Sequence, residues 1–199
     1  MAHAAPLTIL ATAYWPPVDY LLAIQNAQTA RLEWHEHYQK QSYRNRTTIC
    51  GANGPEDLIV PIRLPHGAHT PIADAQPDYS VPWPHQHLHA ISSAYGKSPF
   101  YIHFFPQVQL LLTQQYPTLL QLNSSLLAFL CTHLHIQTPI DHTPYFQAHY
   151  PAPTLDLRYA IHPKHPRPCS LRYFQQFETR YGFLPNASAL DLLFQRGEL

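Results

Sequence analysis

The chain has 199 residues, of which 45% are hydrophobic and only 12% are charged. This length and composition suit one globular domain, spanning residues 1–199, with a core that needs no disulfides or metals. Twelve basic residues balance twelve acidic ones, and this neutral balance argues against nonspecific nucleic-acid binding and against adsorption to an anionic membrane surface.

The cysteines and the apolar runs indicate the compartment. The three cysteines, Cys50, Cys131 and Cys169, form no CxxC spacing, so neither a disulfide framework nor a zinc finger is expected. Residues 1–12 lack the basic flank and long apolar core of a signal peptide. No apolar run approaches the roughly 18–20 residues that span a bilayer. We therefore expect a cytoplasmic protein.

The N-terminal third alternates strand and helix patterns. Residues 7–13 form a short apolar run that predicts a buried strand, which Pro16 and Pro17 end. Apolar positions at helical spacing predict an amphipathic helix from Val18 to about Ala30, and residues 31–34 predict a second strand. Residues 47–50 and 58–64 predict a hairpin with a long loop, because a Gly-Ala-Asn-Gly-Pro turn signal lies between them.

The middle of the chain predicts helices. Residues 65–84 carry five prolines and predict a loop. Helices are expected over residues 85–95, 106–115 and 119–135, the last two separated near Pro117. In the third, one stripe recurs at helical spacing and predicts a face toward the core: Leu119, Leu122, Leu126, Phe129, Leu130 and Leu134.

The C-terminal third begins with a second proline-rich loop, over residues 139–168, with an extended piece at 155–161. Ser170 resembles an N-cap, and the spacing over 171–181 predicts a helix that ends at Gly182. Ser188 and Asp191 form a capping pattern before a last short helix, which the Pro185-Asn186 turn is expected to fix against the sheet. The fold class expected is α/β or α+β, a small mixed sheet from the N-terminal half covered by helices from the C-terminal half. The sheet is expected to hold residues 7–13, 31–34, 47–50 and 58–64, so that the hairpin belongs to it.

The polar segment 35–46, HEHYQKQSYRNR, holds the most informative residues. Arginine offers a planar fork for phosphate or carboxylate, asparagine supplies a donor and an acceptor, and tyrosine can stack on a sugar. This mixture suits a phosphorylated or sugar-like ligand, and a solvated loop is the other interpretation. Lys97, after a helix-ending glycine, either matches the helix dipole or faces an anionic ligand.

Other chemistries have weaker support. His35 and His37, and His85 and His89, are spaced so that two imidazoles converge, but a metal site needs three or four ligands and no HExxH spacing is present. Cys50 follows Ile49 in an apolar strand end and predicts an inert core thiol. No GxSxG, GxGxxG or P-loop pattern occurs, so a serine hydrolase or such a nucleotide site is not expected. We therefore expect no metal and no cofactor.

Four blocks in order resemble the WbqC-like protein family, whose members are often associated with bacterial polysaccharide gene clusters. They are AYWPPVDYLLAI at 13–24, HEHYQKQSYRNRTTICGANGPEDLIVPI at 35–62, DYSVPWPHQHLHAISSAYGKSPFYIHF at 78–104, and GFLPNASALDLLFQRG at 182–197. The chain departs from the family pattern where acidic residues are common before the Tyr-x-Lys segment, because His35 and its neighbours stand there.

The resemblance implies a transferase-like enzyme that acts on a nucleotide-sugar or amino-sugar intermediate of surface polysaccharide synthesis. His35 or His87 is the expected general base, since imidazole titrates near neutral pH. Arg46 and Lys97 are expected to bind phosphate or stabilise an oxyanion. The ligand-binding residues expected are Tyr14, Tyr38, Lys40, Tyr43, Asn45, Arg46 and Lys97. The partner expected is a small, phosphorylated or sugar-linked molecule; a non-catalytic glycan- or partner-binding module and a His-based metalloprotein are the alternatives.

Overall fold

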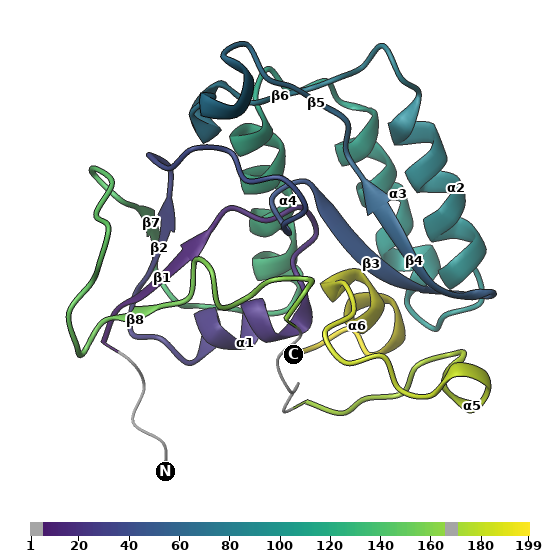
Figure 1. Ribbon diagram of the computed structural model, residues 1–199. Helices are drawn as coiled ribbons and strands as arrows, with labels where there is room; N and C mark the ends of the chain where they lie inside the picture. Colours follow the sequence, from purple (N-terminus) through teal and green to yellow (C-terminus); the bar gives the residue numbers. More distant parts are fainter. Residues whose placement is uncertain (1–5, 166–170) are drawn as a thin grey trace.

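The computed structural model describes residues 6–165 and 171–199. The chain is mixed α/β, with a small parallel sheet on one side, a pair of helices on the other, and a long β-hairpin between them (Figure 1). The sheet has four parallel strands in the order β7-β2-β1-β8: β1 (Thr8–Ala11), β2 (Ala30–Glu33), β7 (Ile140–His142) and β8 (Leu155–Asp156).

The first two strands and the helix between them confirm the βαβ pattern of the N-terminal third. All four residues of β1 are buried, as a parallel strand covered on both faces requires. Helix α1 (Val18–Gln25) ends at Asn26, earlier than predicted, because Ala30 already pairs in β2 opposite Thr8. The hydroxyl of Tyr20 donates to the backbone oxygen of Ala11, so α1 is tied to the strand that precedes it.

The prediction that the hairpin belongs to the main sheet is wrong. β3 (Arg46–Gly51) and β4 (Gly54–Ile59) pair only with each other. The turn between them is two residues long, shorter than predicted, and Gly54 takes a φ of 108° there, which favours glycine. A second small pair, β5 (Ile62–Arg63) with β6 (Gln76–Pro77), closes the first proline-rich loop. This loop also holds two short 3₁₀ helices, η1 (Gly67–His69) and η2 (Ile72–Asp74).

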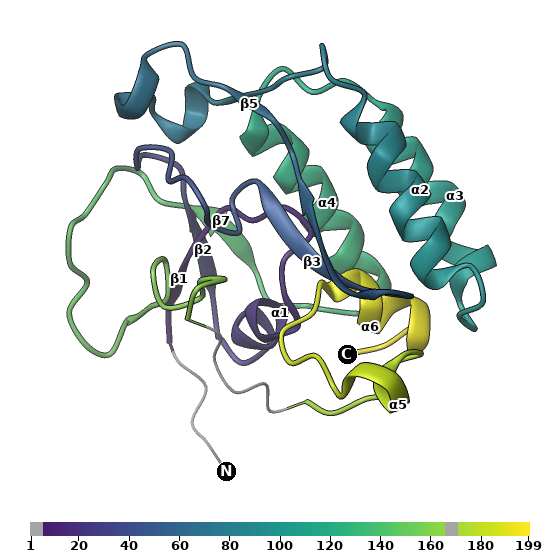
Figure 2. The same cartoon turned by 45° about the vertical axis from the view of Figure 1, so that its right-hand side comes forward.

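Three helices follow, α2 (Trp83–Tyr95), α3 (Tyr101–Thr113) and α4 (Leu119–His133). α2 and α3 begin earlier than predicted, since Pro84 lies in the first turn of α2 and Pro106 is accommodated inside α3. Thr118 caps α4 by accepting from the Gln121 backbone N–H. The predicted apolar stripe of α4 is buried, so that prediction is confirmed. Both views place α4 between the sheet and the α2–α3 pair (Figure 2).

The C-terminal third corrects two predictions. The second proline-rich loop contributes β7 and β8 to the sheet, although only an extended piece was expected. The helix predicted over 171–181 is wrong: only α5 (Glu178–Tyr181) is helical, because the Gln175 side chain bonds both backbone groups of Leu184 and holds the segment as a loop. Ser170 lies outside the described residues.

The last helix, α6 (Ala189–Gln195), is capped by Ser188 as predicted, since its hydroxyl accepts from the Leu190 backbone N–H. The segment before it docks on the start of α1 and on β3: Ser188 N–H donates to Thr48 and Val18 N–H donates to Ala187. The core joins residues of β1, α1, α2, α4 and α6. Within the described part of the chain, no helix has both the length and the apolar character needed to cross a membrane.

Candidate functional site at the carboxyl edge of the sheet

The carboxyl ends of the four parallel strands meet at one edge of the sheet, and polar residues gather there. Glu33 is the last residue of β2, Thr143 follows β7, and Asp156 ends β8. Between β1 and β8 the strand order reverses. In open parallel sheets, ligands bind outside the carboxyl ends at such a reversal. The fold therefore directs attention to this edge.

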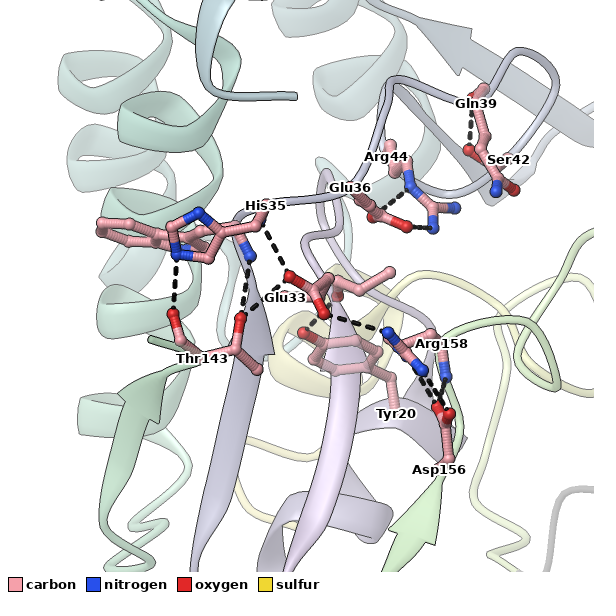
Figure 3. Close-up of polar contacts among 12 residues, drawn as sticks. Tyr20, Glu33, His35, Glu36, Gln39, Ser42, Arg44, Thr143, Asp156 and Arg158 are labelled. Carbon is pink, nitrogen blue, oxygen red and sulfur yellow. Dashed lines mark hydrogen bonds and ion pairs between the residues drawn. The ribbon is translucent and has the colours of Figure 1, made fainter. Parts of the chain in front are cut away.

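Glu33 is the centre of a buried polar network (Figure 3). Its carboxylate is fully buried and accepts from Arg158 Nη1 at 2.9 Å, from Thr143 Oγ1 at 2.9 Å and from the His35 backbone N–H at 2.8 Å. Arg158 is also bound in bidentate fashion by Asp156, at 2.9 and 2.6 Å. Burial lowers the pKa of Arg158, but the hydrogen bonds and charge of Asp156, together with the charges of Tyr159 and Glu33, raise it above its usual value, so this guanidinium stays charged.

A second buried ion pair lies beside the first (Figure 3). Arg44 Nε and Nη2 donate to the two oxygens of Glu36 at 2.7 and 2.6 Å. Burial raises the pKa of Glu36, and Arg44 opposes this shift through its hydrogen bonds and its charge. Asn123 of α4 donates to the Arg44 backbone oxygen and to Thr12 Oγ1, which fixes Arg44 to the end of β1.

Between the two ion pairs lies a shallow crevice. It is lined by the end of β1, by Tyr43 and Arg44, and by Leu157, Arg158 and Ile161 beyond β8. Its enclosed volume is about 10 Å³, which holds about one water. A sugar-sized ligand would therefore lie across the mouth of the crevice and not inside it.

Aromatic rings lie around the guanidinium of Arg158, which lines this crevice. The Arg158 guanidinium lies 5.4 Å from the ring centre of Phe146, 4.9 Å from Tyr150 and 5.6 Å from Tyr159. Tyr159 also lies 6.0 Å from the Arg44 guanidinium and is 47% exposed. One half-exposed ring thus borders both buried arginines, and an exposed aromatic face next to fixed donors suits a sugar or a base.

Of the two predicted bases, only His35 lies at this edge. Its Nε2 is 2.9 Å from the backbone oxygen of Thr143. Because a carbonyl can only accept, Nε2 donates, and Nδ1 of the neutral ring keeps its lone pair. The ring is exposed and its backbone is anchored on Glu33.

His87 lies elsewhere, buried in α2 behind the hairpin. Its Nδ1 is 2.8 Å from the Tyr14 hydroxyl, and its ring bonds the backbone of Ile59. Burial lowers the pKa of His87 to about 4, and the bond to Ile59 opposes this shift. With both ring nitrogens occupied, His87 is a neutral part of the core that also holds Tyr14.

The predicted ligand-binding residues do not all lie at one place. Tyr43 lines the crevice, and burial raises its pKa to about 12, so the phenol is neutral. Asn45 Nδ2 donates to the Val60 backbone oxygen and holds the hairpin. Lys40 is exposed on the 35–46 segment. Tyr14 belongs to the core, where its backbone N–H donates to Tyr43.

Arg46 and Lys97 are not brought together. Arg46 begins β3, whereas Lys97 follows α2, whose Tyr95 accepts from the backbone N–H of Cys50 near the other end of β3. The four residue-to-residue steps from Arg46 to Cys50 correspond to about 13 Å of strand. Burial raises the pKa of Tyr38 to about 12. The charges of Arg46 and Arg44 oppose this shift, which indicates that Tyr38 lies near both arginines.

The carboxylates and Arg158 were missed by the sequence analysis. It placed His35 and its neighbours where acids are common in the family, yet Glu33 and Glu36 stand on either side of His35. A carboxylate at the end of a buried strand is the signal that could have revealed Glu33. Arg158 carries no such signal, since it lies in a proline-rich loop.

Cys50 is a buried thiol, and burial raises its pKa, as the prediction of an inert cysteine requires. Over residues 6–165 and 171–199, no three His, Cys, Asp or Glu side chains group as metal ligands would.

Comparison with known proteins gives one match. The family model described as the WbqC-like protein family matches residues 12–162. No curated protein and no solved structure matches the sequence significantly. The matched range contains the residues that line the crevice, with the exception of Ala11.

Proposed function

Because the chain belongs to the WbqC-like protein family, we propose that it is a transferase-like enzyme that acts on a nucleotide-sugar or amino-sugar intermediate of surface polysaccharide synthesis. The substrate class follows from the association of such proteins with polysaccharide gene clusters, which is a weaker basis than site chemistry. What the structure adds in support is the carboxyl-edge crevice.

The observation that carries the proposal is the position of Tyr159 over both buried arginines. Its exposed face offers a stacking surface for a sugar ring or a base. The charges of Arg44 and Arg158 are balanced by Glu36, Glu33 and Asp156. The floor of the crevice is therefore polar and fixed while carrying little net charge, which suits a ligand rich in hydroxyl groups.

His35 is the proposed general base. Its Nδ1 lone pair is free in the tautomer that the Thr143 carbonyl selects. In a group transfer to an amino or hydroxyl group, the new bond to the acceptor forms as the bond between the transferred group and its donor breaks, and the donor leaves with that electron pair. His35 Nδ1 would take the proton that the acceptor loses. Tyr43 and Arg46 are the proposed substrate contacts. His87, Lys97, Tyr14 and Asn45 have no part in this proposal, because their positions are structural or remote.

A thermal-shift and calorimetry screen with nucleotide-sugars tests the proposal. A ligand at 100 times its dissociation constant raises the free energy of unfolding by about 2.7 kcal/mol. Tyr159→Ala is expected to weaken binding at least tenfold, whereas Phe174→Ala, which removes an aromatic ring 67% exposed on the C-terminal segment, leaves affinity unchanged. His35→Ala is expected to lower turnover with little effect on affinity, and His89→Ala, an exposed histidine of α2, serves as its control. Equal effects of Tyr159→Ala and Phe174→Ala would refute the crevice as the site.

A second candidate is a non-catalytic glycan-binding module. It is favoured by two observations: His87 is enclosed in the core, and the carboxylates of the crevice floor are engaged in ion pairs. This module would bind a sugar ligand through Tyr159 in the same way. It differs in showing no turnover with any acceptor, and in being indifferent to His35→Ala.

A further inference from the structure

A turn at residues 162–165 follows directly from the wall of the crevice at Ile161. The backbone N–H of His165 donates to the His162 oxygen at 3.0 Å, and the backbone N–H of Lys164 donates to His162 Nδ1 at 3.1 Å. With Nδ1 accepting, the neutral His162 ring carries its proton on Nε2, where it can donate. The two imidazole rings of the turn lie 5.9 Å apart.

Arg44 and Ile161 line the same crevice, and Arg46 begins β3 two residues after Arg44, so the start of β3 and this turn lie on the same side of the crevice. The Arg46 side chain is half-buried, and its Nε has no hydrogen-bond partner among the described residues. Within the same part of the chain, it forms no salt bridge, in contrast to Arg44, which Glu36 neutralises. A half-buried guanidinium that has no carboxylate partner has lost part of its hydration, and no opposite charge compensates for that loss.

The cations of the turn and of the hairpin act on one another. Burial and the charges of His165, Lys164, Arg44 and Arg46 all lower the pKa of His162. These groups come from two elements, the turn itself and the chain that enters β3, and Glu36 is the carboxylate paired with one of them. Close positive groups repel each other, and an anion placed among them would relieve that repulsion.

We propose that the turn of His162, Lys164 and His165, together with Arg46, forms a phosphate subsite at the mouth of the crevice. The Arg46 fork and the Lys164 ammonium supply charge-assisted donors, and His162 Nε2 supplies a third. Tyr159 lies on the same segment, shortly before the turn. A sugar stacked on Tyr159 would thus carry its phosphate or diphosphate group into the subsite.

This subsite deepens the proposed function, and only the identity of the whole substrate rests on that function. Anion binding by the turn can be tested independently of the identity of the whole substrate, so simple anions are the appropriate probes. Pyrophosphate and inorganic phosphate distinguish a diphosphate group from a phosphate monoester. Sulfate keeps its charge between pH 6 and 8, whereas a phosphate monoester titrates near pH 6, so sulfate is the probe for pH dependence.

Calorimetric titration of the whole chain at constant ionic strength is the test. Lys164→Gln and Arg46→Gln are each expected to weaken pyrophosphate binding about tenfold or more. Arg180→Gln, which removes an equal charge from an exposed arginine beside Ala52, should leave it unchanged. Sulfate affinity should rise as the pH falls from 8 to 6, because a bound anion favours the charged form of an imidazole in the turn, and replacing both imidazoles, in His162→Gln/His165→Gln, should remove that rise. Circular dichroism checks that each variant is folded.

Three results would overturn the subsite: absence of anion binding, equal losses in Arg180→Gln and Lys164→Gln, or a pH dependence that survives the double variant His162→Gln/His165→Gln. The two proposals are separable. If a nucleotide-sugar binds and Lys164→Gln and Arg46→Gln leave its affinity unchanged, the subsite is wrong and the enzyme proposal stands. If pyrophosphate binds through Lys164 while no sugar ligand binds, the subsite stands and the proposed function is wrong.

Discussion

One buried carboxyl group of α6 is expected to contribute a loss of stability as the pH rises from about 4 to above 6. Asp191 is fully buried, and its Oδ2 accepts from the Tyr173 hydroxyl at 2.8 Å. Burial raises the pKa of Asp191 from 3.8 to about 6, although hydrogen bonds from Tyr173 and Tyr95 oppose the shift. The folded state therefore holds this proton at a pH where the unfolded chain has lost it.

The size of the effect follows from that shift. Moving a carboxyl pKa from 3.8 to about 6 corresponds to about 3 kcal/mol of folding free energy. Because the folded pKa is the higher one, this stabilisation is complete below about pH 4 and is lost as the pH rises through about 6. Asp191→Asn keeps an oxygen that can accept from Tyr173 but removes the ionisation.

Urea unfolding of the wild type and of Asp191→Asn across pH 3.5 to 7.5 measures this difference. The free energy of unfolding of the variant, relative to wild type, should rise by about 3 kcal/mol over that range. Glu56→Gln, at an exposed position of β4, should show no comparable change. A difference between wild type and Asp191→Asn that stays constant with pH would refute the reasoning, because it would mean that Asp191 has the same pKa in both states.

Three further substitutions test the fold. Arg158→Leu leaves Glu33 buried without its partner, so it should lower the free energy of unfolding in urea by about 3–5 kcal/mol. Arg196→Leu removes an exposed ion pair worth about 1 kcal/mol or less, and an equally small loss in Arg158→Leu would contradict the prediction. Thr118→Ala removes the cap of α4 and should cost about 1 kcal/mol, and an unchanged midpoint would show that the cap is not needed. Leu126→Ala opens a cavity in the core and should cost about 2–5 kcal/mol, whereas a loss below 1 kcal/mol would mean that α4 repacks.

The elements that the sequence predicted well depend on local patterns. The strand–helix–strand start, the hairpin and the apolar stripe of α4 are all set by residues close in the chain. The hairpin was nevertheless assigned to the wrong sheet. Its two strands pair with each other in register from Arg46↔Ile59 to Gly51↔Gly54. A local sequence pattern cannot reveal whether any other strand pairs with the outer edges of the hairpin.

The remaining elements depend on contacts between distant residues. β7 and β8 are three and two residues long, too short for a periodic signal. The predicted helix over 171–181 had the right spacing, but the Gln175 side chain bonds Leu184 and replaces helical hydrogen bonds. The candidate site was half predicted for the same reason: His35, Tyr43 and Arg46 lie in one polar segment, whereas Arg158 reaches Glu33 across 125 positions of sequence.

The same buried groups stabilise the crevice and the sheet, and this determines which variants can test the function of the crevice. Strands as short as β7 and β8 gain little from backbone pairing, and Glu33 joins them through Thr143 and Arg158. Removal of these buried groups would lower affinity simply because the edge of the sheet loosens. Tyr159 and Lys164 are exposed, and no hydrogen bond among the described residues joins their side chains to the Glu33 network, which Tyr159 meets through its ring beside Arg158. A loss of binding in variants of these rim residues, with unchanged stability, would therefore report on recognition itself.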